Sequence, residues 1–338
     1  MIPFDYHQPP SLNDAMATID HDRCMAIGGG TTMIDLMKLN VLKPTKVVHV
    51  RNVLDDTIER RNDVLIVGAA CTMSALADHE FVQQQLPAVR QSLILAASPQ
   101  IRNMATIGGN LMQRTRSTYF RHTDMPIRQS DNEFGEGVDT TLMAVLGNSG
   151  RLVGMYPGDF AITMVAFDAH IKLSGPGGKR TLAARDFYQI PTDTFQYTTR
   201  LQPGELITHI IFSVTDALRN SYYLKVRERS SYAFALASAS IGIVIANDVI
   251  ESASVGIGGL GSIPWHSGEA ETALIGKPPT DATFEAAADA ALQPANAPVG
   301  LEYKVTLAKR VIVRALKTLR DQGPLSDDQL WAMQHGRT

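Results

Sequence analysis

The chain has 338 residues, of which 44% are hydrophobic and 19% are charged, and its formal net charge is −3. This composition is typical of an ordinary globular protein and gives no reason to expect nucleic acid or an anionic membrane as a partner. No apolar run is long enough for a transmembrane helix, and the start of the chain has no signal-peptide pattern. The length predicts two or three lobes rather than a single core.

The first predicted elements alternate between helix and strand. Ser11 is expected to begin a helix, with Asp14 close to a capping-box position. A second helix is expected from Met33 to near Asn40. Short strands rich in apolar and β-branched residues are expected at 24–27, 46–50 and 64–67.

A glycine-rich turn, Gly28-Gly29-Gly30, lies between the first of these strands and the second helix. Backbone N–H groups at such a position can meet a phosphate group, and glycine permits its close approach. Thr31 and Thr32 follow directly, and their hydroxyl groups can donate to phosphate oxygens. Taken alone, the three glycines could equally form an ordinary tight turn.

A second glycine-rich stretch, Thr106 to Asn110, comes after a helix expected at 86–97, which Pro99 should end. Ile101 and Ile107 add apolar surface beside its polar donors. Neither stretch matches the Rossmann or P-loop fingerprint. Together they suggest one large ligand, partly aromatic and partly phosphorylated, that is held from two sides. The alternative is a pair of structural turns.

The segment 111–157 is polar and irregular, which indicates either a functional insertion or a mobile loop. Its run of arginines is typical of a solvated loop or a partner-binding patch. The run consists of Arg114, Arg116, Arg121 and Arg128.

The remaining pattern indicates an α+β N-terminal part that ends between residues 190 and 215, then a second α+β lobe with strands first and helices last. On the pattern alone, Asp159 is a helix-capping or hydrogen-bonding residue, and Lys225 and Arg227 form the solvated face of a strand. Regular structure is expected at 159–173, a turn at 175–178, strands at 206–214, 221–226, 241–246 and 250–256, and a helix at 303–320.

No motif predicts a metal site or a catalytic nucleophile. The nine histidines do not fall at metal-ligand spacings, and the sequence has no nucleophile elbow. Cys24 and Cys71 are the only cysteines, and two isolated cysteines cannot hold an iron–sulfur cluster. Buried thiols in a reducing compartment are the expected state of both.

The chain resembles the FAD-binding (medium) subunits of molybdenum hydroxylases, the family of xanthine dehydrogenase, carbon monoxide dehydrogenase and aldehyde oxidoreductase. The resemblance covers nearly the whole length of the chain, and the Thr106–Asn110 stretch is its most specific part. The other stretches that carry it are 27–38, Tyr156–Asp159, Tyr223–Arg229, Gly258–Trp265 and the final helix from Glu302.

The resemblance implies an α+β fold of two domains. Residues 1–215 would form an FAD-binding domain of the vanillyl-alcohol oxidase (PCMH) type, with two subdomains divided near 60 and an insertion at 111–158. Residues 216–325 would form the small α+β CO dehydrogenase flavoprotein C-terminal domain, followed by a tail at 326–338.

The resemblance also implies a non-covalent FAD site. Asp159 would hold the cofactor by hydrogen bonds, Lys225 would lie near the flavin, and Ile207 would make an apolar contact. Around the pyrophosphate the implied residues are Ile27, Gly28, Gly29, Gly30, Thr31, Thr32, Met33 and Ile34, and from the second side they are Ile101, Thr106, Gly109 and Asn110.

Such a subunit transfers electrons and carries no catalytic residue for the organic substrate. In the family, a large molybdopterin-binding subunit oxidises the substrate, and a small subunit with [2Fe–2S] clusters passes the electrons to the FAD. The flavin then delivers them to an external acceptor, while the protein binds, orients and tunes the cofactor.

Within the family, the segment Gln113–Pro126 is similar to the insertion of periplasmic aldehyde oxidoreductases, which binds an extra [4Fe–4S] cluster through cysteines. Ser117 and Ile127 stand where cysteines would be expected, and residues 111–158 contain none. Because ligation requires thiolates, we expect no [4Fe–4S] cluster in this chain.

Two alternatives remain at this point. A standalone FAD-dependent oxidase of the vanillyl-alcohol oxidase superfamily would need its own substrate pocket, and an adaptor that has lost FAD would not need intact glycine loops. We expect a cytoplasmic protein, with export to the periplasm on a partner's twin-arginine signal as the alternative.

Overall fold

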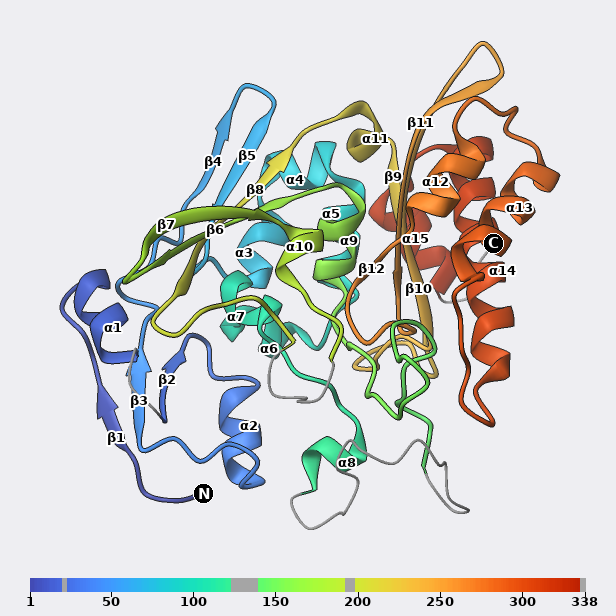
Figure 1. The fold of residues 1–338 in the computed structure, drawn as a ribbon. Helices are drawn as coiled ribbons and strands as arrows, with labels where there is room; N and C mark the ends of the chain where they lie inside the picture. Colours follow the sequence, from blue (N-terminus) through green and yellow to red (C-terminus); the bar gives the residue numbers. More distant parts are fainter. Residues whose placement is uncertain (20–22, 123–138, 192–197, 335–338) are drawn as a thin grey trace.

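A computed structural model describes residues 1–19, 23–122, 139–191 and 198–334, and within them the strands form three sheets (Figure 1). The sheets have three, five and four strands, and helices pack between and around them. Within the same residues, none of the helices combines the length and apolar character needed to span a membrane.

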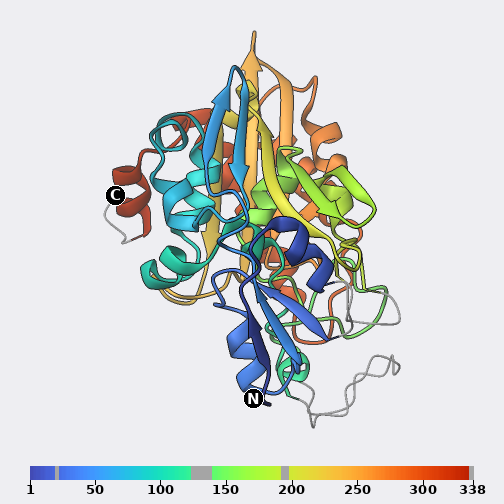
Figure 2. The same cartoon turned by 90° about the vertical axis from the view of Figure 1, so that its left-hand side faces the viewer.

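The three-stranded sheet forms a small N-terminal lobe, which extends below the rest of the molecule in Figure 2. Its strands run parallel in the spatial order β1 (Asp5–His7), β3 (Lys46–His49) and β2 (Cys24–Ile27). Parallel neighbours need crossover connections, and α1 (Leu12–Ile19) and α2 (Met33–Lys38) lie in these connections. The lobe has its own small cluster of buried residues, made of Ala15, Val48, Val50 and Leu206.

The five-stranded sheet is antiparallel and joins distant parts of the chain. Its spatial order is β4 (Ile58–Arg61), β5 (Val64–Gly68), β8 (Leu206–Ser213), β6 (His170–Gly175) and β7 (Gly178–Ala183). The segment between β5 and β6 forms short helices, which are α3 (Met73–Asp78), α4 (Glu80–Gln85), α5 (Pro87–Ile94), α6 (Pro99–Met104), α7 (Ile107–Leu111), α8 (Thr118–Arg121) and α9 (Phe160–Ala166).

The four-stranded antiparallel sheet carries the C-terminal helices on its outer face (Figure 1). Its strands, in spatial order, are β12 (Trp265–His266), β11 (Val249–Gly258), β10 (Ala237–Ala246) and β9 (Ser221–Val226). The remaining helices are α10 (Ala184–Phe187), α11 (Asp216–Arg219), α12 (Gly268–Leu274), α13 (Asp281–Leu292), α14 (Glu302–Gln322) and α15 (Asp327–Gln334).

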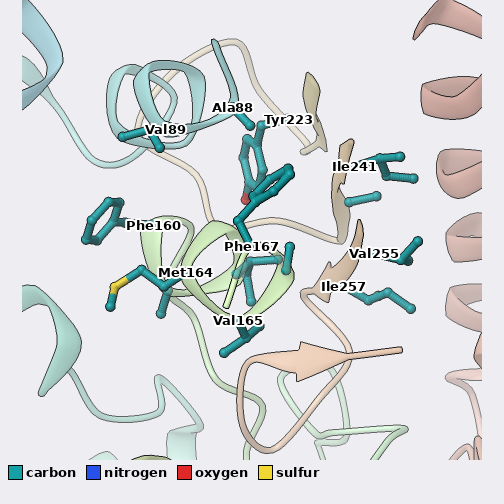
Figure 3. Packing of buried hydrophobic residues seen from close by; sticks show 14 of the residues in the cluster. Ala88, Val89, Phe160, Met164, Val165, Phe167, Tyr223, Ile241, Val255 and Ile257 are labelled. Carbon is teal, nitrogen blue, oxygen red and sulfur yellow. The ribbon is translucent and has the colours of Figure 1, made fainter. Parts of the chain in front are cut away.

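Helix α9 connects the two larger sheets through one continuous core. All of its residues are buried, which suits a helix without charged residues that is covered on every side. In Figure 3, Phe160 and Met164 lie to the left of this helix, and Ile241 and Val255 of the four-stranded sheet lie to its right. The Phe160 ring meets Phe212 of β8 in the five-stranded sheet, with ring centroids 6.0 Å apart. The same cluster of buried residues extends along the chain from Leu65 to Leu330.

The sequence located most of these elements but misjudged some boundaries. The helix expected at 86–97 ends at Ile94, and Pro99 starts the new helix α6, where a proline at the first position leaves no N–H unpaired. The stretch 159–173 is divided between α9 and β6. The second lobe ends in helices, as expected, and these include α12 and the alanine-rich α13, for which the pattern predicted no bounds.

Candidate functional site

The two glycine-rich stretches lie in direct contact, although they are far apart in the sequence. A Cβ atom on Gly29 would lie 1.9 Å from the carbonyl oxygen of Met104, and one on Gly28 would lie 2.7 Å from Oγ1 of Thr106. Gly30 has φ +73°, a left-handed conformation that favours glycine. The contact therefore leaves no room for side chains at the first two glycines and disfavours one at the third.

The second stretch is fixed by hydrogen bonds to the residues that directly follow β5. The N–H groups of Ile107 and Gly108 donate to the carbonyl oxygens of Cys71 and Ala69, at 2.8 and 2.9 Å. Thr106 caps α7, since its Oγ1 accepts from the N–H of Gly109 at 3.2 Å. The surface that meets the first glycine turn is thus held by the segment that leaves the five-stranded sheet after β5.

A first cavity of about 370 Å³ lies beside this contact, at the C-terminal end of β2. Its walls come from residues 24–33, from the 105–109 turn and from residues 201–207. In the described chain, the backbone N–H groups of Gly28 to Thr32 donate to no protein acceptor. A row of free N–H groups on a glycine turn suits an anionic ligand.

A second cavity of about 530 Å³ adjoins the first. Thr31, Thr32, Ala105 and Gly109 line both cavities, so the two meet at the glycine turn. Its apolar wall includes Ile101, Leu142, Met155 and Leu236, and its polar groups include Asn110, Gln113 and Asp159. The two cavities together form one site, and the N–H groups of the glycine turn lie where the cavities join.

Asp159 presents a carboxylate whose two oxygens are both held by buried donors. The hydroxyl of Tyr223 donates to Oδ1 at 2.6 Å, and Nζ of Lys225 donates to Oδ2 at 2.8 Å. Lys225 also donates to the carbonyl oxygen of Leu95 at 3.0 Å. Burial, with the nearby Asp159 charge, raises the pKa of Tyr223 well above its usual value, so this tyrosine remains a donor.

The predicted site residues come together with two exceptions. Ile34 lies outside both cavities on α2 and is 42% exposed. Lys225 lies behind Asp159, and its side chain is 1% exposed. The residues that do line one or both cavities are Ile27, Gly28, Gly29, Gly30, Thr31, Thr32, Met33, Ile101, Thr106, Gly109, Asn110, Asp159 and Ile207.

The burial of the Lys225 side chain corrects one expectation from the pattern. Alternation with Leu224 and Val226 predicted a solvated strand face, but both faces of β9 at this point are covered by protein. Asp159 occupies the N-cap position of α9, yet its side chain makes no capping bond because Tyr223 and Lys225 hold it instead.

The arginines after Asn110 are also not a solvated loop. Arg116 and Arg121 both donate to Oδ2 of Asp35, at 3.1 and 2.7 Å, and their side chains are about one-fifth exposed. The Arg114 guanidinium lies over the ring of Phe120, and burial lowers its pKa. Arg114 lines the first cavity and Arg116 the second. Arg128 lies outside the described residues.

Several lining residues were missed from the sequence. Residues 201–206 enter the first cavity, and Gln113, Tyr232 and Lys304 enter the second. The similarity of the 113–126 segment to a known insertion was the signal that could have drawn attention to Gln113. Nothing in the spacing of α14 distinguishes Lys304 from the exposed lysines of that helix.

The described residues contain no group of three or more His, Cys, Asp or Glu side chains arranged to hold a metal ion. Ser117, one of the two positions where cysteines were expected, is 3% exposed and precedes α8. Ile127, the other, lies outside the described residues. Burial raises the pKa of the Cys71 thiol to about 12, so this cysteine stays protonated at neutral pH.

Two protein families match consecutive parts of the chain. The FAD binding domain in molybdopterin dehydrogenase matches residues 2–213, and the CO dehydrogenase flavoprotein C-terminal domain matches residues 222–319. The predicted fold class, an FAD-binding domain followed by this C-terminal domain, is therefore confirmed.

Individual proteins of known identity are similar to this chain over nearly its full length. The aldehyde oxidoreductase FAD-binding subunit PaoB of Escherichia coli is 35% identical over 88% of this chain and 91% of its own length. The carbon monoxide dehydrogenase medium chain of Afipia carboxidovorans is 29% identical over 94% and 97%. Reconstituted CO dehydrogenase from Oligotropha carboxidovorans superposes with a TM-score of 0.74 at 27% identity, over 94% and 98%. The chain belongs to the FAD-binding medium subunits of the molybdenum hydroxylases, which are subunits of oxidoreductase complexes.

Proposed function

We propose that the two joined cavities hold one FAD, and that this chain passes electrons from the [2Fe–2S] clusters of a small partner subunit to an external acceptor. A separate large subunit with the molybdenum cofactor would oxidise the organic substrate. Membership in the family supports this assignment. The observation that carries it is the contact of the two glycine stretches at the junction of the cavities.

The donors present fit an FAD diphosphate. The free N–H groups of Gly28 to Thr32 and the hydroxyls of Thr31 and Thr32 offer neutral donors to phosphate oxygens. Arg114 and Arg116 add positive charge on either side of the junction. The cofactor's diphosphate would therefore lie at the junction.

The walls of the cavities fit the two ring systems. Ile27, Ile207 and Leu36 give the first cavity an apolar side for an adenine. Ile101, Leu142 and Met155 give the second a larger apolar side for a flavin. FAD supplies the redox chemistry, and we assign no acid–base residue to this chain.

In this proposal Asp159 orients the cofactor. Because Tyr223 and Lys225 fix both carboxylate oxygens, the remaining lone pairs point in a defined direction. Asp159 accepts a hydrogen bond from the cofactor, and Lys225 acts through Asp159 as a positioning residue.

Copurification of the native complex, with cofactor and metal analysis, tests the function. We expect one FAD per chain, together with a molybdenum subunit and a [2Fe–2S] subunit. A chain that purifies with its partners but without flavin absorbance would contradict the proposal. So would an isolated flavin-loaded chain that oxidises aldehydes on its own, the result expected of a standalone oxidase.

The iron content of the chain, its electron acceptor and its cellular compartment remain predictions. We expect no [4Fe–4S] cluster in the segment after Asn110, so iron analysis of the isolated chain should not give about four atoms per chain. NAD, oxygen, a quinone or a soluble carrier could each serve as acceptor, and stopped-flow reoxidation of the reduced chain with each of them would identify it. The cytoplasm is the expected compartment, with periplasmic export on a partner as the alternative.

A further inference from the structure

Lys304, near the start of α14, is a buried lysine at the second cavity. The residue is 1% exposed and lines the cavity together with Met155. Its Nζ donates to the carbonyl oxygen of Gly259 at 3.1 Å and to Sδ of Met155 at 3.5 Å. An ammonium group has three N–H donors, so one is left for an occupant of the cavity.

No acidic side chain of the described chain pairs with Lys304. Lys225 differs in this respect, since its side chain is also buried but has Asp159 as its counter-ion. Burial alone accounts for the pKa of Lys304, which falls from 10.5 to about 8. The protonated amine is therefore held at neutral pH without compensation by an anion.

The other charges that line this cavity are already paired or exposed. Asp159 is neutralised by Lys225, and Arg116 shares Asp35 with Arg121. Glu228 and Arg229 lie in an exposed stretch of the chain. Lys304 is thus the buried charge without a counter-ion among the described residues of the second cavity.

Packing does not require a charge at this position. Helix α14 is anchored by apolar residues of its buried face, among them Ala308, Ile312 and Leu316. A neutral side chain of similar length would fill the same space without the cost of burying an ammonium group. An uncompensated buried charge in a cavity is accordingly a candidate functional group.

We propose that Lys304 stabilises the negative charge on the flavin when it is reduced, and so raises the reduction potential of the bound FAD. The inference rests on the proposed function. Two electrons from the partner's [2Fe–2S] clusters and one proton from solvent convert the neutral flavin ring into a reduced anion. A positive charge beside the ring favours the anion over the neutral oxidised form, which is how proteins tune flavins.

The test compares variants of the full chain loaded with FAD. Lys304→Met removes the charge and the donor, Lys304→Gln removes the charge and keeps a donor for Gly259, and Lys304→Arg keeps the charge. Lys309→Met is the matched control, because Lys309 is on the same helix but pairs with Asp289 at the surface. The reduction potential is measured by equilibration with a reference dye, and the affinity for oxidised FAD by titration.

We expect Lys304→Met and Lys304→Gln to lower the equilibrium constant for flavin reduction about tenfold or more, which is about 30 mV for a two-electron couple. Lys304→Arg should retain most of the potential, and Lys309→Met should leave it unchanged. Affinity for oxidised FAD should change little. If Lys304→Met does not fold, the result for Lys304→Gln decides.

A wild-type potential in Lys304→Gln would overturn the inference while leaving the proposed function intact. Equal weakening of oxidised and reduced FAD would also overturn it, since Lys304 would then bind a part of the cofactor whose charge does not change. A wild-type chain that binds no FAD would instead refute the proposed function.

Discussion

The two cavities that meet at Thr31 and Thr32 are built by different means. The first is shaped by backbone, since glycines allow two chain segments to touch and leave a row of N–H groups free. The second is lined by two buried charged residues, Asp159 and Lys304, and Lys225 pairs with Asp159 from behind. We infer that the first site is intolerant of added volume and the second of altered charge.

The largest effect is expected from breaking the charge pair of the second cavity. Asp159→Ala leaves Lys225 buried with only the carbonyl oxygen of Leu95 as partner. Loss of one member of a buried pair costs about 3 to 5 kcal/mol of the free energy of unfolding, which urea denaturation of the chain can measure.

Two controls sharpen this result. The double variant Asp159→Ala, Lys225→Met should recover much of the lost stability, because it removes the orphaned charge. Asp289→Ala, which breaks the surface pair with Lys309, should change stability by less than about 1 kcal/mol. Similar losses for Asp159→Ala and Asp289→Ala would show that the second cavity does not depend on buried charge.

The next largest effect is expected from a side chain added at the glycine turn of the first cavity. Gly29→Ala places a Cβ 1.9 Å from the Met104 carbonyl oxygen, and backbone atoms can accept it only by separating the two glycine stretches. We expect the affinity for FAD to fall at least about 100-fold, equivalent to about 2.7 kcal/mol, in a fluorescence titration.

Gly177→Ala is the matched control for this variant. Its Cβ would meet nothing within 4 Å, and it lies in the turn between β6 and β7, away from both cavities. Its FAD affinity should equal that of the wild type. An unchanged affinity in Gly29→Ala would mean that the contact between the stretches does not form the binding surface.

A smaller effect concerns the charge of Lys304 in the chain without FAD. The pKa of Lys304 is about 8 in the folded chain and about 10.5 when exposed. Between these values the unfolded chain binds more protons, so this group makes the free energy of unfolding rise with pH. Relative to Lys304→Met, the wild type should gain about 2 kcal/mol between pH 7 and pH 9.5. Parallel pH profiles for the two proteins would exclude an uncompensated charge.

The sequence was most informative where local chemistry decides the structure. Ser11 caps α1 as expected, since its Oγ accepts from the N–H of Asp14 at 3.2 Å. The Asp14 carboxylate accepts from the Ser11 hydroxyl, which differs from the bond to the backbone N–H of Ser11 that a capping box would have. The two glycine stretches were recognised because they occur together and are flanked by Thr31, Thr32, Thr106 and Asn110, whereas either stretch alone could be an ordinary turn.

The pairing of strands that are distant in the sequence could not be predicted from the residue pattern. The order of the five-stranded sheet places β5 against β8, and no local propensity encodes that partner. The burial of individual charged residues could not be predicted from the pattern either. Lys304 is one of several basic residues on an amphipathic helix, and Lys225 follows the alternation of a half-exposed strand, so periodicity alone does not distinguish them from surface lysines. The family resemblance identified Lys225 as a site residue but assigned no role to Lys304.

The smallest effect separates stability from binding at the boundary of the two regions. Thr106→Val removes the hydroxyl that accepts from the N–H of Gly109, which should cost about 1 kcal/mol of the free energy of unfolding. Thr215→Val removes the same kind of cap from α11, where the hydroxyl accepts from the N–H of Leu218 at 3.2 Å, and should cost about as much. Because Thr106 lines the first cavity and Thr215 lines neither, only Thr106→Val should also weaken FAD binding. Equal FAD affinities in the two variants, measured by the same fluorescence titration, would mean that Thr106 supports the fold without shaping the cofactor surface.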